Sequence, residues 1–186
     1  MFAVSNIVFI LTLFTLLPSF VSLPAFALPF PVGTQPVKTR RAFDLDRSDR
    51  AAYVLAHNII RAQYNAPPLT WSPSLAAKAT AWADMCMFQH SDGILDTKPY
   101  GENIVAATGD YWVEDAMNTL ISTRDQYNPA SPTYTQFTQL IWKSTTQVGC
   151  AIARCDGIID QTVTLHVCLY DPPGNVVGAL PPNVEA

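Results

Sequence analysis

The sequence predicts an α+β domain in which helices are layered on an antiparallel, disulfide-linked sheet. Three helical patterns come first, and two β-rich runs joined by a short turn follow them. The chain has 186 residues, 49% of them hydrophobic and 14% charged, so it can bury a core of ordinary domain size. The sequence contains no internal repeat. Helices followed by a hairpin favour a layered α+β architecture.

Residues 1–27 have the features of a signal peptide. An apolar core at 7–17 is too short to span a bilayer comfortably, and Ala-Phe-Ala at 25–27 is an A-x-A cleavage signal. No positive charge precedes the core, and Phe-Val-Ser at 20–22 is a weaker cleavage site. Because no stop-transfer flank follows, we expect a secreted, extracellular protein without stable membrane insertion.

Residues 28–45 are predicted to be a linker or pro-segment, because 28–37 are proline-rich and aperiodic. Lys-Thr-Arg-Arg at 38–41 is either a dibasic, kexin-type processing site or a solvated charge cluster. The predicted domain then occupies 46–186.

Charge and cysteine content limit the partners and the compartment. The net charge of -4 and the pI near 5.2 argue against a nucleic-acid partner, which requires a basic face. In a secreted chain the four cysteines are expected to form disulfides, and four cysteines allow three connectivities. We expect a monomer that carries no cofactor.

A first helix is predicted from Asp46 to the prolines at 67–68, which stop it. Its spacing places four apolar residues in one stripe. These are Ala51, Leu55, Ile59 and Ala62. Another face carries His57 and Arg61, four residues apart. The same face also holds Tyr53, Ile60 and Tyr64.

A second helix is predicted to begin after a short extended piece at 69–71. Ser72 is its expected N-cap and Pro73 its first residue. Its predicted buried stripe consists of Leu75, Ala79, Trp82 and Cys86. A loop rich in Ser, Asp and Gly is expected to fill 89–99.

A third helix is predicted at 110–127, and a proline-bracketed loop at 128–132 ends it. Its inward residues are predicted to be Val113, Met117, Leu120 and Ile121. A short amphipathic helix is expected next, around Phe137, Leu140 and Ile141.

Two β-rich runs, at 148–154 and 162–170, flank the turn Cys-Asp-Gly and predict an antiparallel hairpin. Cys150 and Cys168 would face each other near its open end, where a disulfide is geometrically feasible. The remaining pair is Cys86 and Cys155.

Four motifs follow one another along the predicted domain. They are HNIIR at 57–61, GENI at 101–104, FTQLIW at 137–142 and CLYDPPGN at 168–175. Each alone is weakly specific, but together they resemble the CAP superfamily of cysteine-rich secretory proteins, antigen 5 and plant pathogenesis-related class 1 proteins. The resemblance covers essentially the whole domain. It implies a three-layer α-β-α sandwich with Cys150 bonded to Cys168 and Cys86 bonded to Cys155, and the dibasic site suggests a fungal member.

The resemblance also implies a surface groove where family members commonly place two histidines and two glutamates, and where some bind a divalent metal. By motif, the first histidine is His57 and the first glutamate is Glu102. The second histidine falls at Gln136 and the second glutamate at Thr123. A zinc site needs about three or four good ligands, and a neutral amide is a poor one. We therefore expect no metal site, or at most weak binding through His57 and Glu102.

Alternatives stay open for individual polar residues. His57 is a cleft residue or a core histidine bonded to the backbone, and the motif favours the cleft. Glu102 is a groove carboxylate or an acceptor for backbone N–H groups. His90 is expected to cap a helix or pack, and His166 to be structural. Two polar residues of the first helix are expected to hold the 101–104 segment; they are Asn58 and Arg61.

The function that the resemblance implies is binding of small lipids, either sterols or fatty acids, in lipid export, sequestration or host interaction. The segment before FTQLIW is the candidate lipid loop. Its candidate residues are Tyr127, Pro129, Pro132 and Tyr134. An aromatic, proline-bracketed loop can cover an apolar ligand, and the alternative is an ordinary surface loop.

Two other classes of function stay open. One is an interaction module that engages an extracellular host protein or a cell-surface protein. The other, more remote, is a hydrolase in which His57 and Glu102 act with Ser144 or Ser91 as nucleophile. No nucleophile elbow or other catalytic motif accompanies these residues. We therefore expect no enzymatic activity and assign no catalytic residue.

Overall fold

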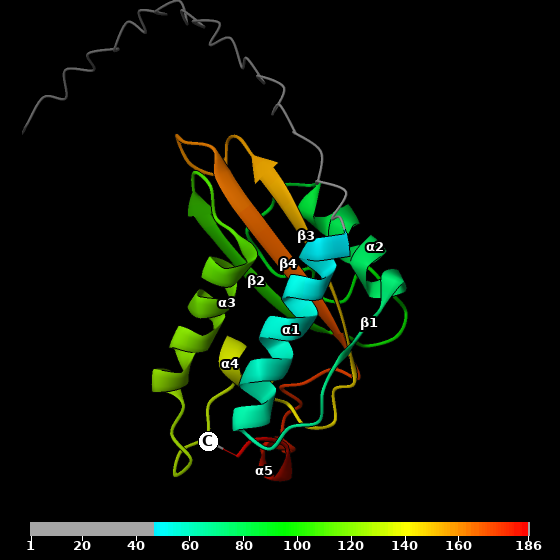
Figure 1. The fold of residues 1–186 in the computed structure, drawn as a ribbon, viewed down its shortest axis with the longest axis vertical. Coiled ribbons are helices and arrows are strands. Elements are labelled where there is room, and N and C mark those ends of the chain that lie inside the picture. The colour runs from blue at the N-terminus through cyan, green and yellow to red at the C-terminus, as the bar shows by residue number, and fades with distance from the viewer. Residues whose placement is uncertain (1–46, 186) are drawn as a thin grey trace, which may run out of the picture. The chain divides into compact units, whose positions relative to one another are not determined.

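The computed structural model describes residues 47–185 (Figure 1). The expected signal peptide and the linker with its dibasic site lie outside the described residues. A four-stranded sheet carries helices on both faces, which confirms the expected α-β-α sandwich. No helix within 47–185 combines the length and the hydropathy needed to cross a membrane.

The central sheet has the strand order β1-β3-β4-β2. β1 spans Thr70–Trp71, β2 spans Gly101–Thr108, β3 spans Gln147–Cys155 and β4 spans Val163–Asp171. β3 and β4 form the predicted antiparallel hairpin, and β2 pairs antiparallel with the other side of β4. β1 is a two-residue edge strand that runs parallel to β3.

Two disulfides fasten the sheet. Cys150 and Cys168 are direct partners in the register of β3 and β4, and they are bonded to each other. Cys86, which follows the second helix, is bonded to Cys155 at the end of β3. This is the pairing that the hairpin allows and the resemblance implies. Such cross-links typically contribute about 2–4 kcal/mol each.

One face of the sheet is covered by α2, Pro73–Ala83. Ser72 is its N-cap, as predicted, and Ser72 Oγ accepts a hydrogen bond from Leu75 N at 3.5 Å. Apolar residues of α2 pack here on residues of β4; they are Leu75, Ala79, Trp82, Leu165, Val167 and Leu169. Gly149 of β3 permits this close approach, because a Cβ there would overlap Ala76 N of α2.

The opposite face is covered by α1 (Arg47–Gln63), α3 (Val113–Ser122) and α4 (Gln136–Leu140). Its core includes Tyr53, Ile60, Met117, Leu120, Phe137, Leu140 and Tyr170. The third helix is shorter than predicted, because the chain tightens into the 3-10 turn η1 at Thr123–Gln126. A last short helix, α5, spans Leu180–Asn183.

The buried face of α1 is not its apolar stripe. Leu55 is 62% exposed and Ile59 is 53% exposed, whereas His57 and Arg61 are completely buried. Burying Arg61 is tolerated because its guanidinium donates hydrogen bonds of 2.6–3.0 Å to four backbone carbonyls. The acceptors are Pro67 O, Leu140 O, Trp142 O and Thr145 O.

Arg61 and Asn58 therefore do not hold the 101–104 segment, and that prediction is wrong. Arg61 ties α1 to the residues that end and follow α4. The Asn58 amide brackets Leu69, accepting from its N–H at 2.7 Å and donating to its carbonyl at 3.0 Å. Both residues lie near the C-terminal end of α1 and hold the backbone of neighbouring segments there, so their role is structural.

β2 is a strand that the sequence analysis did not predict. It contains Gly101 and Asn103, which are weak strand formers. Eight residues of β2 nevertheless pair with β4, because the buried neighbouring strand supplies hydrogen-bond partners that local propensity does not predict. The result is that Glu102 and Asn103 lie on the last strand of the sheet, at its open edge.

Candidate functional site

Polar side chains from both faces of the sheet converge at its β2 edge. Successive residues of a strand point to opposite faces. Glu102 accordingly bonds to the loop that follows α2, while Asn103 bonds to the first residue of α4, Gln136. These contacts alone join three segments that lie far apart in the sequence.

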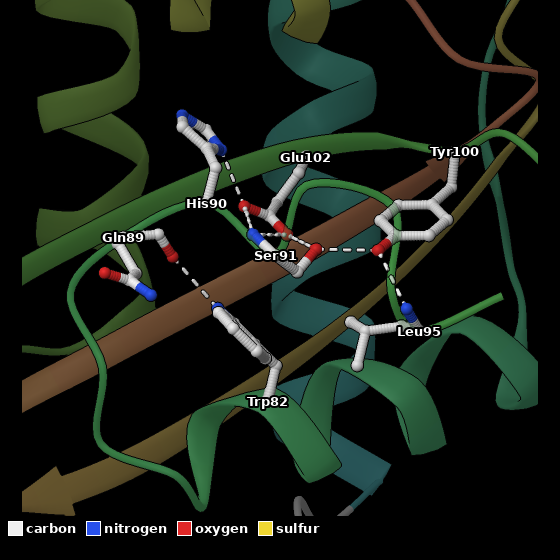
Figure 2. Close-up of polar contacts among 7 residues, drawn as sticks. All are labelled: Trp82, Gln89, His90, Ser91, Leu95, Tyr100 and Glu102. Atoms are coloured by element: carbon white, nitrogen blue, oxygen red, sulfur yellow. Dashed lines mark hydrogen bonds and ion pairs between the residues drawn. The ribbon is translucent and has the colours of Figure 1, made fainter.

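The Glu102 carboxylate is held by the loop that follows α2 (Figure 2). It accepts hydrogen bonds from Ser91 N at 3.2 Å to each oxygen, from Ser91 Oγ, and from His90 Nδ1 at 2.6 Å. The Ser91 hydroxyl accepts in turn from Tyr100 OH at 2.7 Å, and Tyr100 OH accepts from Leu95 N at 3.2 Å. Only 7% of the Glu102 side chain is exposed, so these donors replace its lost water. Glu102 is thus both a groove carboxylate and an acceptor for backbone N–H groups.

His90 is the exposed member of this group, with 60% of its side chain accessible. Its hydrogen bond to Glu102 raises the pKa of His90, and burial opposes that shift only in part. Trp82 of α2 fixes the preceding residue, because its Nε1–H donates to Gln89 O at 3.0 Å (Figure 2). His90 therefore faces the groove, and the expectation that it caps a helix or packs is wrong.

A cavity of about 420 Å³, which we call the β2–α4 cavity, opens beside the pair of His90 and Glu102. It brings together three of the four positions carried over by motif, namely Glu102, Thr123 and Gln136. It is also lined by His90, Asn103, Gln126, Tyr134, Thr135 and Asn175. A second hollow of about 300 Å³ shares His90, Glu102 and Asn175 with it, so the two hollows adjoin.

His57, the fourth position carried over by motif, is not in the groove. It is completely buried in α1, where Nδ1 donates to Tyr53 O at 2.7 Å and Nε2 accepts from Tyr170 OH at 2.9 Å. Burial lowers the pKa of His57 to about 4, so the ring is neutral near pH 7 and suits this bonding. The cleft assignment of His57 is therefore wrong, and His90 takes that place.

A sequence signal for His90 was available. His90 stands in a loop of turn-forming residues, twelve positions before the glutamate that it contacts. His57 lies in the middle of α1, on the face of that helix that is buried. Loops that follow secondary structure elements carry binding residues more often than helix interiors do. That argument favours His90 over His57.

The buried histidines belong to one hydrogen-bonded network that reaches the cavity wall. Asn103 Nδ2 donates to Tyr170 OH at 3.2 Å and to Gln136 O at 3.0 Å, so it joins β4 to α4. His166 accepts from Tyr53 OH at 2.6 Å and donates to Tyr111 O at 2.7 Å. These bonds agree with a structural role for His166.

Gly101 and Gly174 contact the side chain of Gln139 and so hold α4 in position. Gln139 Oε1 accepts from Gly174 N at 2.9 Å, and a Cβ at Gly101 would overlap that same oxygen. Thr138 Oγ1 and Asn175 Oδ1 lie 2.7 Å apart in a hydrogen bond, and Asn175 Nδ2 donates to Thr135 O at 2.9 Å. Three of the recognised motifs therefore meet at one junction beside the cavity.

The residues of the β2–α4 cavity do not fit a divalent metal. Thr123 Oγ1 donates to Leu120 O at 2.8 Å and accepts from Phe137 N at 2.9 Å, so it already serves the backbone. Gln136 Oε1 is a buried acceptor without a hydrogen-bond partner. Within 47–185, no group of three or more His, Cys, Asp or Glu residues could hold a metal ion. Weak or absent zinc binding stays a prediction to be measured.

Only one of the candidate lipid-loop residues lines the cavity, and that residue is Tyr134. Its hydroxyl accepts from Gly178 N at 2.9 Å and donates to Val176 O at 3.3 Å. Tyr127 is half-buried against the α1–α3 core. The two prolines of the loop, Pro129 and Pro132, are exposed.

The two serines considered as nucleophiles are placed differently from a catalytic serine. Ser91 is 2% exposed, and its hydroxyl donates its proton to Glu102 and not to a histidine. Ser144 is exposed, and its backbone N–H donates to Asn183 Oδ1 at 3.1 Å. Neither geometry matches a serine that is activated by a neighbouring base.

Comparisons with known proteins agree with this fold. Residues 54–170 match the family model described as CAP, cysteine-rich secretory protein family. Pathogenesis-related protein 1 of Arabidopsis thaliana is 34% identical over 137 residues, which cover 69% of this chain and 80% of that protein. A probable pathogenesis-related protein of Arthroderma benhamiae is 35% identical over 144 residues, which cover 69% of this chain and 46% of that protein.

Among solved structures, that of NaASP2 with Zn2+ aligns with a TM-score of 0.58 at 18% identity, over 71% of this chain and 83% of that one. At this identity the likeness shows the fold alone. These two sequence relatives come from a plant and a fungus, so a fungal origin for this chain stays a prediction.

Proposed function

The chain belongs to the cysteine-rich secretory protein (CAP) family, and on this premise we propose that it is a secreted protein that binds a small lipid, a sterol or a fatty acid. The observation that carries the proposal is the β2–α4 cavity beside the 127–135 loop. Its volume of about 420 Å³ lies in the range of small-molecule sites. The two disulfides fit an extracellular compartment.

An apolar surface adjoins the cavity and supports a lipid over a purely polar ligand. Tyr134 is exposed, and its hydroxyl reaches the backbone of Val176 and Gly178. Val176 and Val177 are themselves exposed large hydrophobic residues, and Val177 is 85% exposed. We call Tyr134, Val176 and Val177 the apolar rim. A ligand with a polar end and an apolar body can use the cavity and the rim together.

Binding is proposed in preference to catalysis. Glu102 is engaged by Ser91 and His90 and so serves as a fixed acceptor at the cavity wall. Hydrolysis would need a nucleophile within reach of a base, and Ser91 donates to a carboxylate instead. The polar groups here orient a ligand, and none of them is arranged for the serine chemistry considered above.

Equilibrium binding of radiolabelled cholesterol and of a labelled fatty acid to the purified protein tests this function. We expect saturable binding that Tyr134→Ala weakens about tenfold, since covering an aromatic side chain contributes about 1.5 kcal/mol. Trp112→Ala is the matched control, because Trp112 is an exposed aromatic residue on another element, at the start of α3. Absence of saturable binding of either lipid contradicts the proposal.

A second function is favoured by a different observation. The exposed stripe on α1, with Leu55 and Ile59 at its centre, is an apolar surface away from the β2–α4 cavity. Exposed apolar patches commonly mark protein interaction sites, so an extracellular host or cell-surface protein is the partner of this alternative. Pull-down from extracellular extracts with the wild-type protein and with Leu55→Asp separates it from lipid binding. Partners that both proteins retain equally contradict a role for the stripe.

A further inference from the structure

We propose that the β2–α4 cavity selects a lipid whose polar end is a neutral hydroxyl, such as a sterol or a fatty alcohol, over a lipid that ends in a carboxylate. The inference rests on the lipid-binding function proposed above and narrows the ligand class of the same site. Three features of the cavity carry it: its charge, an acceptor without a partner, and the apolar rim.

The charge of the cavity disfavours an anionic headgroup. Glu102 is its one acidic lining residue and His90 its one basic lining residue, and neither lysine nor arginine lines it. The lining therefore carries a charge of −1 when His90 is neutral and zero when His90 is protonated. An ionised carboxylate that enters here loses water next to another carboxylate, and burying an unpaired charge is strongly unfavourable. The Nδ1–H of His90 is already bonded to Glu102, so only Nε2 of a protonated ring is left to donate to such a group.

An acceptor in the cavity wall calls for a donor on the ligand. Gln136 Oε1 is buried and has no hydrogen-bond partner. A buried acceptor left unpaired is costly, so a group that donates to it gains affinity. This oxygen is buried in the structure; rotation about the last side-chain torsion, which is broad and roughly two-fold, turns it toward the cavity and places the amide N–H groups where it was. A hydroxyl supplies one O–H donor to it, whereas an ionised carboxylate supplies only acceptors.

The rim fixes how such a ligand would lie. Tyr134 lines the cavity and also bonds to the backbone of Val176, so the backbone of the rim is held next to the cavity. A hydroxyl placed at Gln136 leaves the apolar body of the ligand to cover Tyr134, Val176 and Val177, which are otherwise exposed. This arrangement matches an amphiphile with a small neutral head.

A matched pair of ligands isolates the headgroup. Oleyl alcohol and oleate share one hydrocarbon chain, and cholesterol is added as the sterol. Equilibrium binding to the wild-type protein is measured at pH 7.5. We expect oleyl alcohol and cholesterol to bind at least about tenfold more tightly than oleate. This ratio corresponds to one favourable polar contact that the two hydroxyl ligands make and oleate does not. Gln136→Leu is expected to weaken binding of the alcohol about fivefold and to change oleate little.

A charge variant makes the test independent of Gln136. Gln126 lines the cavity and is exposed, so Gln126→Lys adds a cation at the site without disturbing the core. It should raise the affinity for oleate about fivefold relative to the affinity for the alcohol, which is the effect of one partly exposed ion pair. Gln161→Lys, in the exposed turn between β3 and β4, adds the same charge elsewhere and is the matched control.

The outcomes separate this inference from the function on which it rests. Oleate that binds as tightly as oleyl alcohol overturns the headgroup selectivity and leaves lipid binding intact. Equal responses to Gln126→Lys and Gln161→Lys would show that the charge of this lining does not act on the oleate carboxylate, and that result also overturns the inference. If none of the three ligands binds, the proposed function fails together with the inference.

Discussion

Lowering the pH should destabilise the folded protein through its two buried histidines. Burial lowers the pKa of His57 and of His166 from 6.5 to about 4. Below pH 6.5 these two histidines bind protons in the unfolded chain but stay neutral in the folded chain. The free energy of unfolding therefore falls as the pH falls from 6.5 toward 4. Each pH unit in that window costs about 1.36 kcal/mol per histidine. Between pH 6.5 and pH 5.0 the loss is about 3 kcal/mol for the two histidines together, because an unfolded histidine is only half protonated at pH 6.5.

The assay is urea unfolding of the disulfide-intact protein at several pH values, followed by the fluorescence of the buried Trp82 and Trp142. His90 works in the opposite direction because its pKa is raised, but its side chain is 60% exposed and its effect is small. The variant His57→Gln should lose about half of the pH dependence between 6.5 and 5.0, in addition to a lower stability overall.

A direct measurement on the wild-type protein covers the case in which the variant does not fold. The imidazole resonances of His57 should not titrate between pH 7.5 and pH 5, whereas those of His90 should titrate above the usual histidine range. A His57 resonance that titrates near pH 6.5 would show that this ring meets solvent. That result would refute the core assignment and restore His57 as a cleft residue.

Two further predictions concern the cavity and the packing of the sheet. Thr123→Glu combined with Gln136→His adds two metal ligands beside the histidine and glutamate already present, so calorimetry should detect micromolar or tighter zinc binding, which we expect to exceed that of the wild-type protein. Equal affinity for both proteins would show that these positions do not limit metal binding. Gly149→Ala should cost about 3 kcal/mol or more in urea unfolding, because its Cβ would overlap the backbone at Ala76. Gly101→Ala should cost less, since its Cβ would overlap the end of the Gln139 side chain, which can shift at the expense of its hydrogen bond to Gly174 N. Equal losses would contradict this difference.

Hydrophobic periodicity predicted the buried face of α2 correctly and that of α1 wrongly. The second helix was predicted with its N-cap at Ser72 and its stripe facing inward, because small and apolar residues there have no competing polar pattern. In α1 the stripe of Leu55 and Ile59 is exposed, and the buried face contains His57 and Arg61. A prediction from periodicity places polar side chains in water. It does not include the backbone carbonyls of other segments that accept hydrogen bonds from the buried guanidinium of Arg61.

The candidate site was predicted in part. Glu102, Thr123 and Gln136 do meet at one cavity. Glu102 lies in the GENI motif, Gln136 directly precedes FTQLIW, and Thr123 followed from the alignment of the third helix. His57 was assigned wrongly, since a motif can place a residue on a helix without telling which face of that helix is buried. The strand β2 was missed because its glycine and asparagine weaken the local pattern, and only its pairing with β4 makes it a strand.

The sequence by itself determined the family, the order of most helices and strands, and the loss of two of the four groove side chains at Gln136 and Thr123. These properties depend on which residue stands at each position of a local motif. The loop position of His90 only favoured it, and the tertiary structure decided that His90 and not His57 stands beside Glu102. That choice depends on the register of β2 against β4 and on the path of the loop after α2, which contacts between distant segments set.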